Sequence, residues 1–435
     1  MSETPAFGGT HRTIESRHFG LDIREHFLTV PWNWDQPMET FELYARELIP
    51  QGGEELPLLV YFQGGPGCEA PRPLEVSGII SEMLRSYRVL LLDQRGTGRS
   101  HRIDSASPAS DRGYERLIQL RQENIIHDAE ALRQALGERQ VAVFGQSYGG
   151  FLIMTYLTLY PAAISKAYMT GGMPGLSHSI DEVYTSTYQH LAIRHQRWFQ
   201  EYPEAQEKLR ELCDHLENHT EFLPNGQQLT SRLFRTLGIQ LGREFGPHQL
   251  SYLLEAPFHQ LRGEKRLTAN FLASVGAQVE TQRNPLYSVI HESIYGGIGG
   301  QTTTAWAAER LRERIPGFAA TPEKDEPLYL TGEHIFSWQF EEDPALQPFA
   351  QAATQLAYHQ WNSSPYNVEI LREVEVPIAA TMYVDDIFVP FEISQASAAQ
   401  LADVRAYMTN QWQHDGIGHA GKDIFARMHQ LLTSY

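Results

Sequence analysis

The chain alternates between short, almost purely apolar runs and segments in which apolar residues recur with helical spacing. The apolar runs, each leading into a loop that contains glycine, are typical of strands covered on both faces: 56–67, 88–100, 141–144 and 166–172. Helical segments lie between them: 73–87, 116–137 and 151–160. Two further strands are predicted upstream, at 27–37 and 40–50. The alternation predicts an α/β fold with a mostly parallel central sheet.

The pattern changes between residues 173 and 365. Short segments rich in aromatic and charged residues dominate there, for example 182–219, and strand-like runs are scarce. The earlier pattern then resumes with two strands and a closing helix: 376–386, 404–410 and 422–435. We therefore predict a core domain in two pieces, 1–172 and 366–435, with a large helical cap domain, 173–365, inserted before the penultimate core strand.

One tight strand-to-helix junction carries a candidate nucleophile. The strand that begins at Val141 leads into Gly145-Gln-Ser-Tyr-Gly149, and an apolar helix follows that stops at Pro161. A strained turn with an exposed central hydroxyl requires small residues around it, and a helix N-terminus favours developing negative charge. A plain serine helix cap is the alternative. The flanking strand and helix favour Ser147 as a nucleophile.

A serine nucleophile needs a base that takes its proton and an acid that orients the base. In this architecture the acid and then the histidine follow the serine along the chain, each after a strand. Asp385 and Asp386 both follow the penultimate strand and are the candidates for the acid. His414 and His419 follow the last strand. We favour His414, because a histidine that reaches over the nucleophile should leave the sheet early.

Backbone N–H groups are also needed to stabilise the oxyanion that forms on the attacked carbonyl. One should come from Tyr148, directly after the nucleophile. The second should come from the loop Gln63-Gly-Gly-Pro-Gly67, where Gly64 and Gly65 let the backbone approach a substrate without a Cβ in the way. A plain turn is the alternative for this loop, but its place after a buried strand favours an oxyanion hole.

Composition narrows the range of partners. The 435 residues carry a net charge of −18, which argues against nucleic acid or an anionic membrane as a partner. The first twenty residues have no apolar core of a signal peptide, and only Cys68 and Cys213 are present, so a cytoplasmic location is expected. The 18 histidines form no H-E-x-x-H motif and no Gly-Lys-Ser/Thr follows the glycine loop, so no metal or cofactor is expected. Nothing indicates an oligomeric state.

Three motifs occur in order: QGGPG at 63–67, DQRGTGRS at 93–100 and GQSYGG at 145–150. Together they resemble the longer members of the prolyl aminopeptidases, or proline iminopeptidases, of the α/β-hydrolase fold. The resemblance implies a serine peptidase that releases N-terminal proline from peptides with a free N-terminus. It also implies a triad of Ser147, Asp386 and His414. Gln63 stands where shorter members carry histidine, and either side chain can organise the loop by hydrogen bonding.

The resemblance further implies carboxylates in the cap that bind the free amine of the substrate. Glu292 and Glu333, each a lone acid beside aromatic and apolar residues, are the candidates. Nearby aromatic residues would form either a pocket for the proline ring or ordinary core: Tyr295, Trp306, Phe336 and Trp338. A di- or tripeptidyl aminopeptidase or a small-ester hydrolase on the same scaffold is the alternative, because fold and triad do not fix the substrate. A binding protein without turnover is the alternative of another class.

Overall fold

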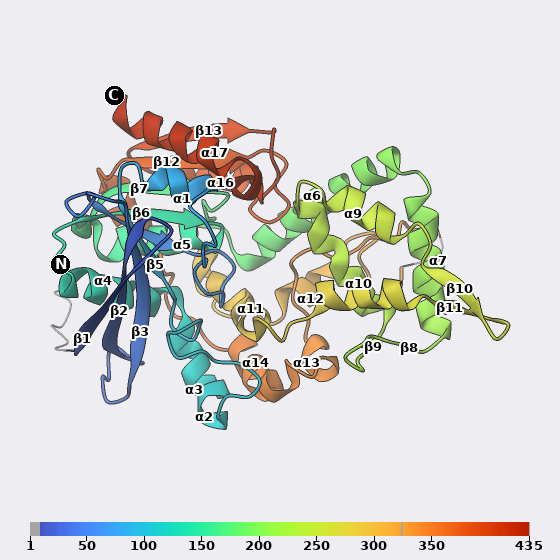
Figure 1. Ribbon diagram of the computed structural model, residues 1–435. Helices are drawn as coiled ribbons and strands as arrows, with labels where there is room; N and C mark the ends of the chain where they lie inside the picture. Colours follow the sequence, from blue (N-terminus) through green and yellow to red (C-terminus); the bar gives the residue numbers. More distant parts are fainter. Residues whose placement is uncertain (1–8, 323–324, 435) are drawn as a thin grey trace.

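A nine-stranded sheet forms the centre of the computed structural model, which describes residues 9–322 and 325–434 (Figure 1). Its strands are β1 (His11–His18), β2 (Leu21–Pro31), β3 (Thr40–Ile49), β4 (Leu58–Phe62), β5 (Arg88–Leu92), β6 (Val141–Gln146), β7 (Ile164–Thr170), β12 (Ile378–Tyr383) and β13 (Val404–Thr409). Their spatial order is β1-β2-β3-β5-β4-β6-β7-β12-β13. The first three strands pair antiparallel, β3 meets β5 antiparallel, and every pair from β5 to β13 is parallel. Parallel strands bring their carboxyl ends to one edge, where a site can be assembled.

Helices cover both faces of the sheet, and the strand residues alternate between the two apolar clusters beneath them. On β6, for example, Val141 and Val143 belong to the cluster under α4 and α5, whereas Ala142 and Phe144 belong to the cluster under α1 and α17. The helices outside the inserted segment are α1 (Gly78–Met83), α2 (Ala109–Arg112), α3 (Tyr114–Leu117), α4 (Gln122–Ala135), α5 (Tyr148–Leu159), α16 (Phe391–Ala398) and α17 (Gly416–Thr433). Burial on both faces explains why these strands are almost purely apolar.

The segment between β7 and β12 forms a separate mass of helices beside the carboxyl ends of the strands (Figure 1). Its helices are α6 (Ile180–Glu201), α7 (Ala205–Asn218), α8 (Ser231–Arg235), α9 (Gly246–Leu253), α10 (Ala269–Val279), α11 (Pro285–Ile290), α12 (Ala307–Arg312), α13 (Gln339–Glu342) and α14 (Ala350–Ala357). Two small hairpins, β8 (Glu221–Phe222) with β9 (Gln228–Leu229) and β10 (Phe258–Leu261) with β11 (Glu264–Leu267), complete it. The last helix before β12, α15 (Val368–Glu373), packs against α5 of the core instead. No helix within the described residues is both long enough and apolar enough to cross a bilayer.

The structure confirms the predicted fold class, a mostly parallel sheet with a helical cap inserted before the penultimate core strand. The domain boundaries at 172/173 and 365/366 stay a prediction, and residues 1–8 of the predicted core piece lie outside the described residues. The sequence did not predict β1, a mostly exposed edge strand whose polar residues lack the alternation of a half-buried strand. The helix predicted at 116–137 is divided into α3, a short 3-10 turn and α4.

Candidate active site

The junction between β6 and α5 holds Ser147 in a strained conformation. Its backbone angles, φ of 54° and ψ of −124°, lie outside the regions that residues other than glycine normally adopt. A Cβ added at Gly145 would lie 2.3 Å from the backbone of Gly149, and one at Gly149 would lie 2.2 Å from the carbonyl oxygen of Phe62. The turn therefore closes only with glycine at these positions, and it places Ser147 at the N-terminus of α5.

Asp386 and His414 meet at the carboxyl ends of the last two strands. Asp386 Oδ2 lies 2.7 Å from His414 Nδ1, and Asp386 Oδ1 accepts backbone N–H groups of Phe388 and Val389 at 2.8 and 3.1 Å. Because a carboxylate only accepts, Nδ1 of His414 carries the proton, which leaves Nε2 available as a base. Burial by itself lowers the pKa of His414, but the charge and hydrogen bond of Asp386, with the charge of Glu333, outweigh burial and raise that pKa.

The two alternative residues have other partners. Asp385 pairs at 2.7 Å with Arg197 of the cap helix α6, and His419 Nε2 lies 3.1 Å from Asp415 within the first turns of α17. The last strand ends at Thr409 and α17 begins at Gly416, so His414 lies in the connecting loop and His419 does not.

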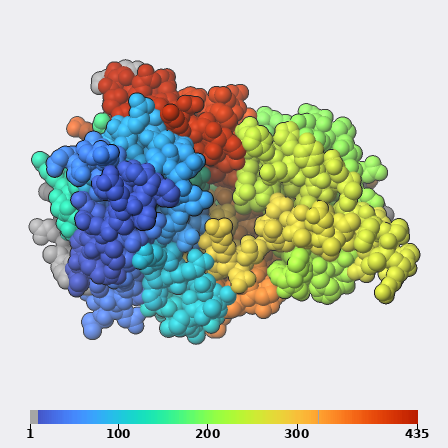
Figure 2. Space-filling model, in the orientation of Figure 1, coloured from blue at the N-terminus to red at the C-terminus, as the bar shows by residue number. Residues whose placement is uncertain are grey.

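Ser147 and His414 line one cavity of about 720 Å³. Gly171 and Gly172, which follow β7, lie between them: an added Cβ at Gly171 would be 3.2 Å from His414 Nδ1, and one at Gly172 would be 2.5 Å from the Ser147 carbonyl oxygen. Sequence reasoning missed this role, although the paired glycines after a buried strand were its signal. Figure 2 shows a hollow where the blue and red core segments meet the yellow-green cap.

The glycine loop after β4 lies directly against the nucleophile turn. A Cβ on Gly64 would stand 2.5 Å from the carbonyl oxygen of Gln146 and 3.0 Å from Ser147 Cβ, and Gly65 has a φ of +63°. Both glycines line the cavity. Tyr148 begins α5, so its backbone N–H is one of the unpaired donors at a helix N-terminus. These groups can surround an oxyanion on a carbonyl attacked by Ser147.

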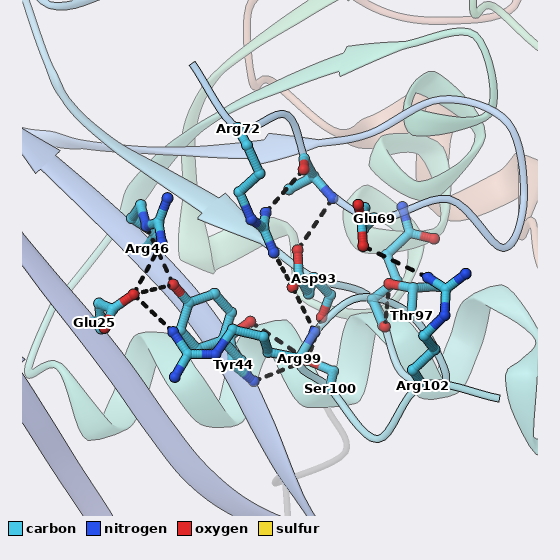
Figure 3. Close-up of polar contacts among 12 residues, drawn as sticks. Glu25, Tyr44, Arg46, Glu69, Arg72, Asp93, Thr97, Arg99, Ser100 and Arg102 are labelled. Carbon is cyan, nitrogen blue, oxygen red and sulfur yellow. Dashed lines mark hydrogen bonds and ion pairs between the residues drawn. The ribbon is translucent and has the colours of Figure 1, made fainter. Parts of the chain in front are cut away.

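The motif 93–100 contacts the chain that follows the glycine loop (Figure 3). Asp93 is fully buried, and its carboxylate accepts from the backbone N–H of Ala70 at 3.1 Å and of Arg99 at 2.8 Å. It also pairs with the Arg72 guanidinium, which in turn donates to the Ala70 carbonyl oxygen at 2.8 Å. Asp93 thereby fixes the chain that leaves the glycine loop. Sequence reasoning noted the motif only as a family signature, because Ala70 and Arg72 lie more than twenty residues before Asp93.

The two cap acids occupy different places. Glu333 lines the cavity with Ser147, and its Oε2 accepts from the hydroxyl of Tyr287 at 3.1 Å. Burial raises the pKa of Glu333 to about 7, against the opposing charge of His414 and the Tyr287 hydrogen bond. A carboxyl with this pKa at the wall of a cavity is poised to respond to a cationic ligand.

Glu292 lies outside the residues that line this cavity. Its two oxygens accept the backbone N–H groups of Ala307 and Ala308 at 3.2 and 3.1 Å, where α12 begins. Burial raises the pKa of Glu292 to about 7, although the two backbone hydrogen bonds act to lower it. The four aromatic candidates for a proline pocket also lie outside the lining, which instead contains Tyr287 and Phe388. Within the described residues, no group of three or more His, Cys, Asp or Glu side chains could hold a metal ion.

Comparison with known proteins agrees with the fold described above. A family model described as the alpha/beta hydrolase fold matches residues 57–284, more than half of the chain, so the class of the protein is an α/β hydrolase. A proline iminopeptidase of Aeromonas sobria is 38% identical over 95% of this chain and 97% of its own length. One from Aspergillus aculeatus is 28% identical over 92% of each chain. The chain belongs to the proline iminopeptidase family.

The solved structures similar to this chain include a proline iminopeptidase of Mycobacterium smegmatis. It is 14% identical, with a TM-score of 0.44, and the match covers 93% of this chain and 97% of that chain.

Proposed function

We propose that the chain is a serine aminopeptidase that releases proline from the N-terminus of peptides. Ser147 is the nucleophile, His414 the base and Asp386 the acid that holds the imidazole. The proposal rests on one observation above all: Asp386 and His414 form a hydrogen-bonded pair at the wall of the cavity that Ser147 also lines. Family membership adds support, since the full-length relatives bear the name of this activity.

The proposed reaction proceeds through an acyl-enzyme. The Ser147 hydroxyl attacks the carbonyl carbon of the first residue while its proton moves to Nε2 of His414. The N–H groups of Tyr148 and of Gly64 or Gly65 stabilise the oxyanion. The imidazolium then gives its proton to the departing amine, and the C–N bond breaks. Water, activated by the same imidazole, hydrolyses the prolyl ester and restores Ser147.

Exopeptidase behaviour requires a group that holds the free amine, because a triad cleaves any well-placed acyl group. A protonated prolyl amine carries one charge and two N–H donors, and burying it is costly unless a carboxylate accepts them. In this proposal Glu333 provides that carboxylate. The oxygens of Glu292 already accept two backbone N–H groups, so we assign Glu292 the support of α12 instead of direct amine binding.

Matched arylamides test the proposal directly. Proline arylamide should be cleaved faster than alanine, leucine or glycyl-proline arylamide. N-acetylation of the proline should lower kcat/KM by at least about 30-fold, because the acetylated amine has lost its charge and both N–H donors. Equal cleavage of the acetylated substrate would favour a simple esterase or amidase. Faster cleavage of glycyl-proline arylamide would favour a dipeptidyl peptidase. The cytoplasmic location and the domain boundaries remain predictions alongside this proposal.

A further inference from the structure

The cavity wall next to His414 carries an exposed cation that the proposed reaction does not use. Arg243 lines the cavity together with Ser147 and His414. Its backbone forms turn hydrogen bonds, but among the described residues its guanidinium has no hydrogen-bond or ion-pair partner. An arginine fork without a partner, facing a substrate-sized cavity, is suited to a carboxylate ligand.

The residues on either side of Arg243 pack against Phe388 and against the loop between β13 and α17 that carries His414. A Cβ added to the preceding Gly242 would lie 2.3 Å from the ring of Phe388, and that ring stands edge-on to His414 with centroids 5.0 Å apart. The following residue, Glu244, donates its backbone N–H to Asp415 Oδ1 at 3.0 Å, and its side-chain Oε2 accepts the backbone N–H of Gln413 at 3.2 Å. These contacts of the two neighbouring residues hold the backbone of Arg243 near the loop that carries His414.

The chemistry of the leaving group determines which part of the substrate lies near Arg243. His414 donates its proton to the departing amine, so the residue that follows proline must lie against His414. In a dipeptide, that residue also carries the C-terminal carboxylate on the same Cα. Each additional residue moves the carboxylate outward by at most about 3.3–3.6 Å. A cation next to His414 thus meets the carboxylate of the shortest substrates.

We propose that Arg243 binds the C-terminal carboxylate of the leaving residue, so that the cavity prefers prolyl dipeptides with a free carboxyl group. This inference rests on the proposed aminopeptidase function and adds the class of leaving group to it. The other cation of the lining, Arg283, lies on the α10–α11 linker, where its charge acts on Cys68 next to the glycine loop. The two oxygens of Asp415, which also lines the cavity, already have partners in Glu244 and His419.

The test compares prolyl-glycine with prolyl-glycinamide, which differ only in the terminal charge. The ratio of their kcat/KM values cancels the fraction of active enzyme. In the wild type we expect a ratio of at least about tenfold, equivalent to about 1.4 kcal/mol, and a decline as glycines are added. Arg243→Gln should bring the ratio to within about threefold of unity, whereas Arg283→Gln, which removes the same charge from the other wall, should retain it. Arg243→Glu should favour prolyl-aminoethylamine, whose leaving group ends in an ammonium.

The outcomes are separable. A wild-type ratio near one, or an unchanged ratio in Arg243→Gln, overturns the inference. An equal loss in Arg243→Gln and Arg283→Gln indicates general attraction of anions by the cavity mouth and also overturns the assignment to Arg243. Failure of the wild type to cleave proline arylamide would instead refute the proposed function, since that substrate has no terminal carboxylate.

Discussion

Removing the charge of Glu333 is the perturbation that separates an aminopeptidase from a general hydrolase. Glu333→Gln keeps the shape of the side chain and an oxygen for the Tyr287 hydroxyl but cannot pair with a protonated amine. Losing one member of a desolvated charge pair costs about 2–5 kcal/mol. Because Glu333 is only partly buried, we take the low end, about 2 kcal/mol, which corresponds to roughly a 30-fold loss in kcat/KM at 1.4 kcal/mol per tenfold.

The assay compares proline arylamide with a neutral acetate ester at about pH 7.5, below the ordinary pKa of about 8 of an α-amino group. The ester has no amine to pair with Glu333, so its hydrolysis should change by less than about threefold, well below the cost of losing a charge pair. Glu280→Gln, which removes an exposed acid from the same cavity, is the matched control and should leave both substrates within the same limit. Equal losses for amine and ester, or no loss for either, would refute amine binding by Glu333.

The ionisation of Glu333 also predicts how activity depends on pH. Glu333, with its pKa raised to about 7, is protonated below that pH and cannot hold the amine cation. The kcat/KM of proline arylamide should therefore fall as pH drops through about 7. Since the charge of Glu333 also raises the pKa of His414, Glu333→Gln should shift the acid limb of ester hydrolysis to lower pH. A limb that stays in place or moves upward would contradict the coupling of these two groups.

Two further substitutions test the support of the site. Asp386→Asn should lower kcat by roughly 10³–10⁴-fold, because an amide N–H toward His414 Nδ1 favours the wrong tautomer. Asp385→Asn loses only a surface pair with Arg197 and should lower kcat by less than about fivefold. A larger loss of kcat in Asp385→Asn than in Asp386→Asn would exchange their roles. Asp93→Asn should lower the free energy of unfolding by about 3 kcal/mol, because it leaves a buried pair with Arg72 broken. Urea unfolding measures this loss, and a midpoint equal to that of the wild type would show that Asp93 does not hold the loop.

The sequence predicted the central strands and the nucleophile turn well because burial on two faces and tight turns leave strong local patterns. Strand β6, Ser147 and α5 are specified by a continuous apolar run, closely spaced glycines and a second apolar run. The choice between His414 and His419 also depended on local information, the distance from the end of the last strand. The edge strand β1 lacked such a pattern, since almost all of its residues are exposed.

The roles of some residues could not be predicted because they depend on contacts with segments distant in the sequence. A lone acid among apolar residues has the same sequence pattern whether it faces a ligand, as Glu333 faces the cavity, or the start of a helix, as Glu292 does. Likewise, Asp93 bonds to Ala70 and Arg72, and Arg243 lines the same cavity as His414, only because segments distant in sequence are packed together. No local pattern records such contacts.

Covalent labelling of Ser147 tests the central claim most directly. The protein is treated with a serine-directed phosphonate, and the adduct is located by mass spectrometry of peptides while the remaining turnover of proline arylamide is measured. We expect one adduct per chain, on Ser147, with activity lost in proportion to labelling, and neither adduct nor turnover in Ser147→Ala. An adduct on another residue, or turnover that survives complete labelling of Ser147, would contradict the account.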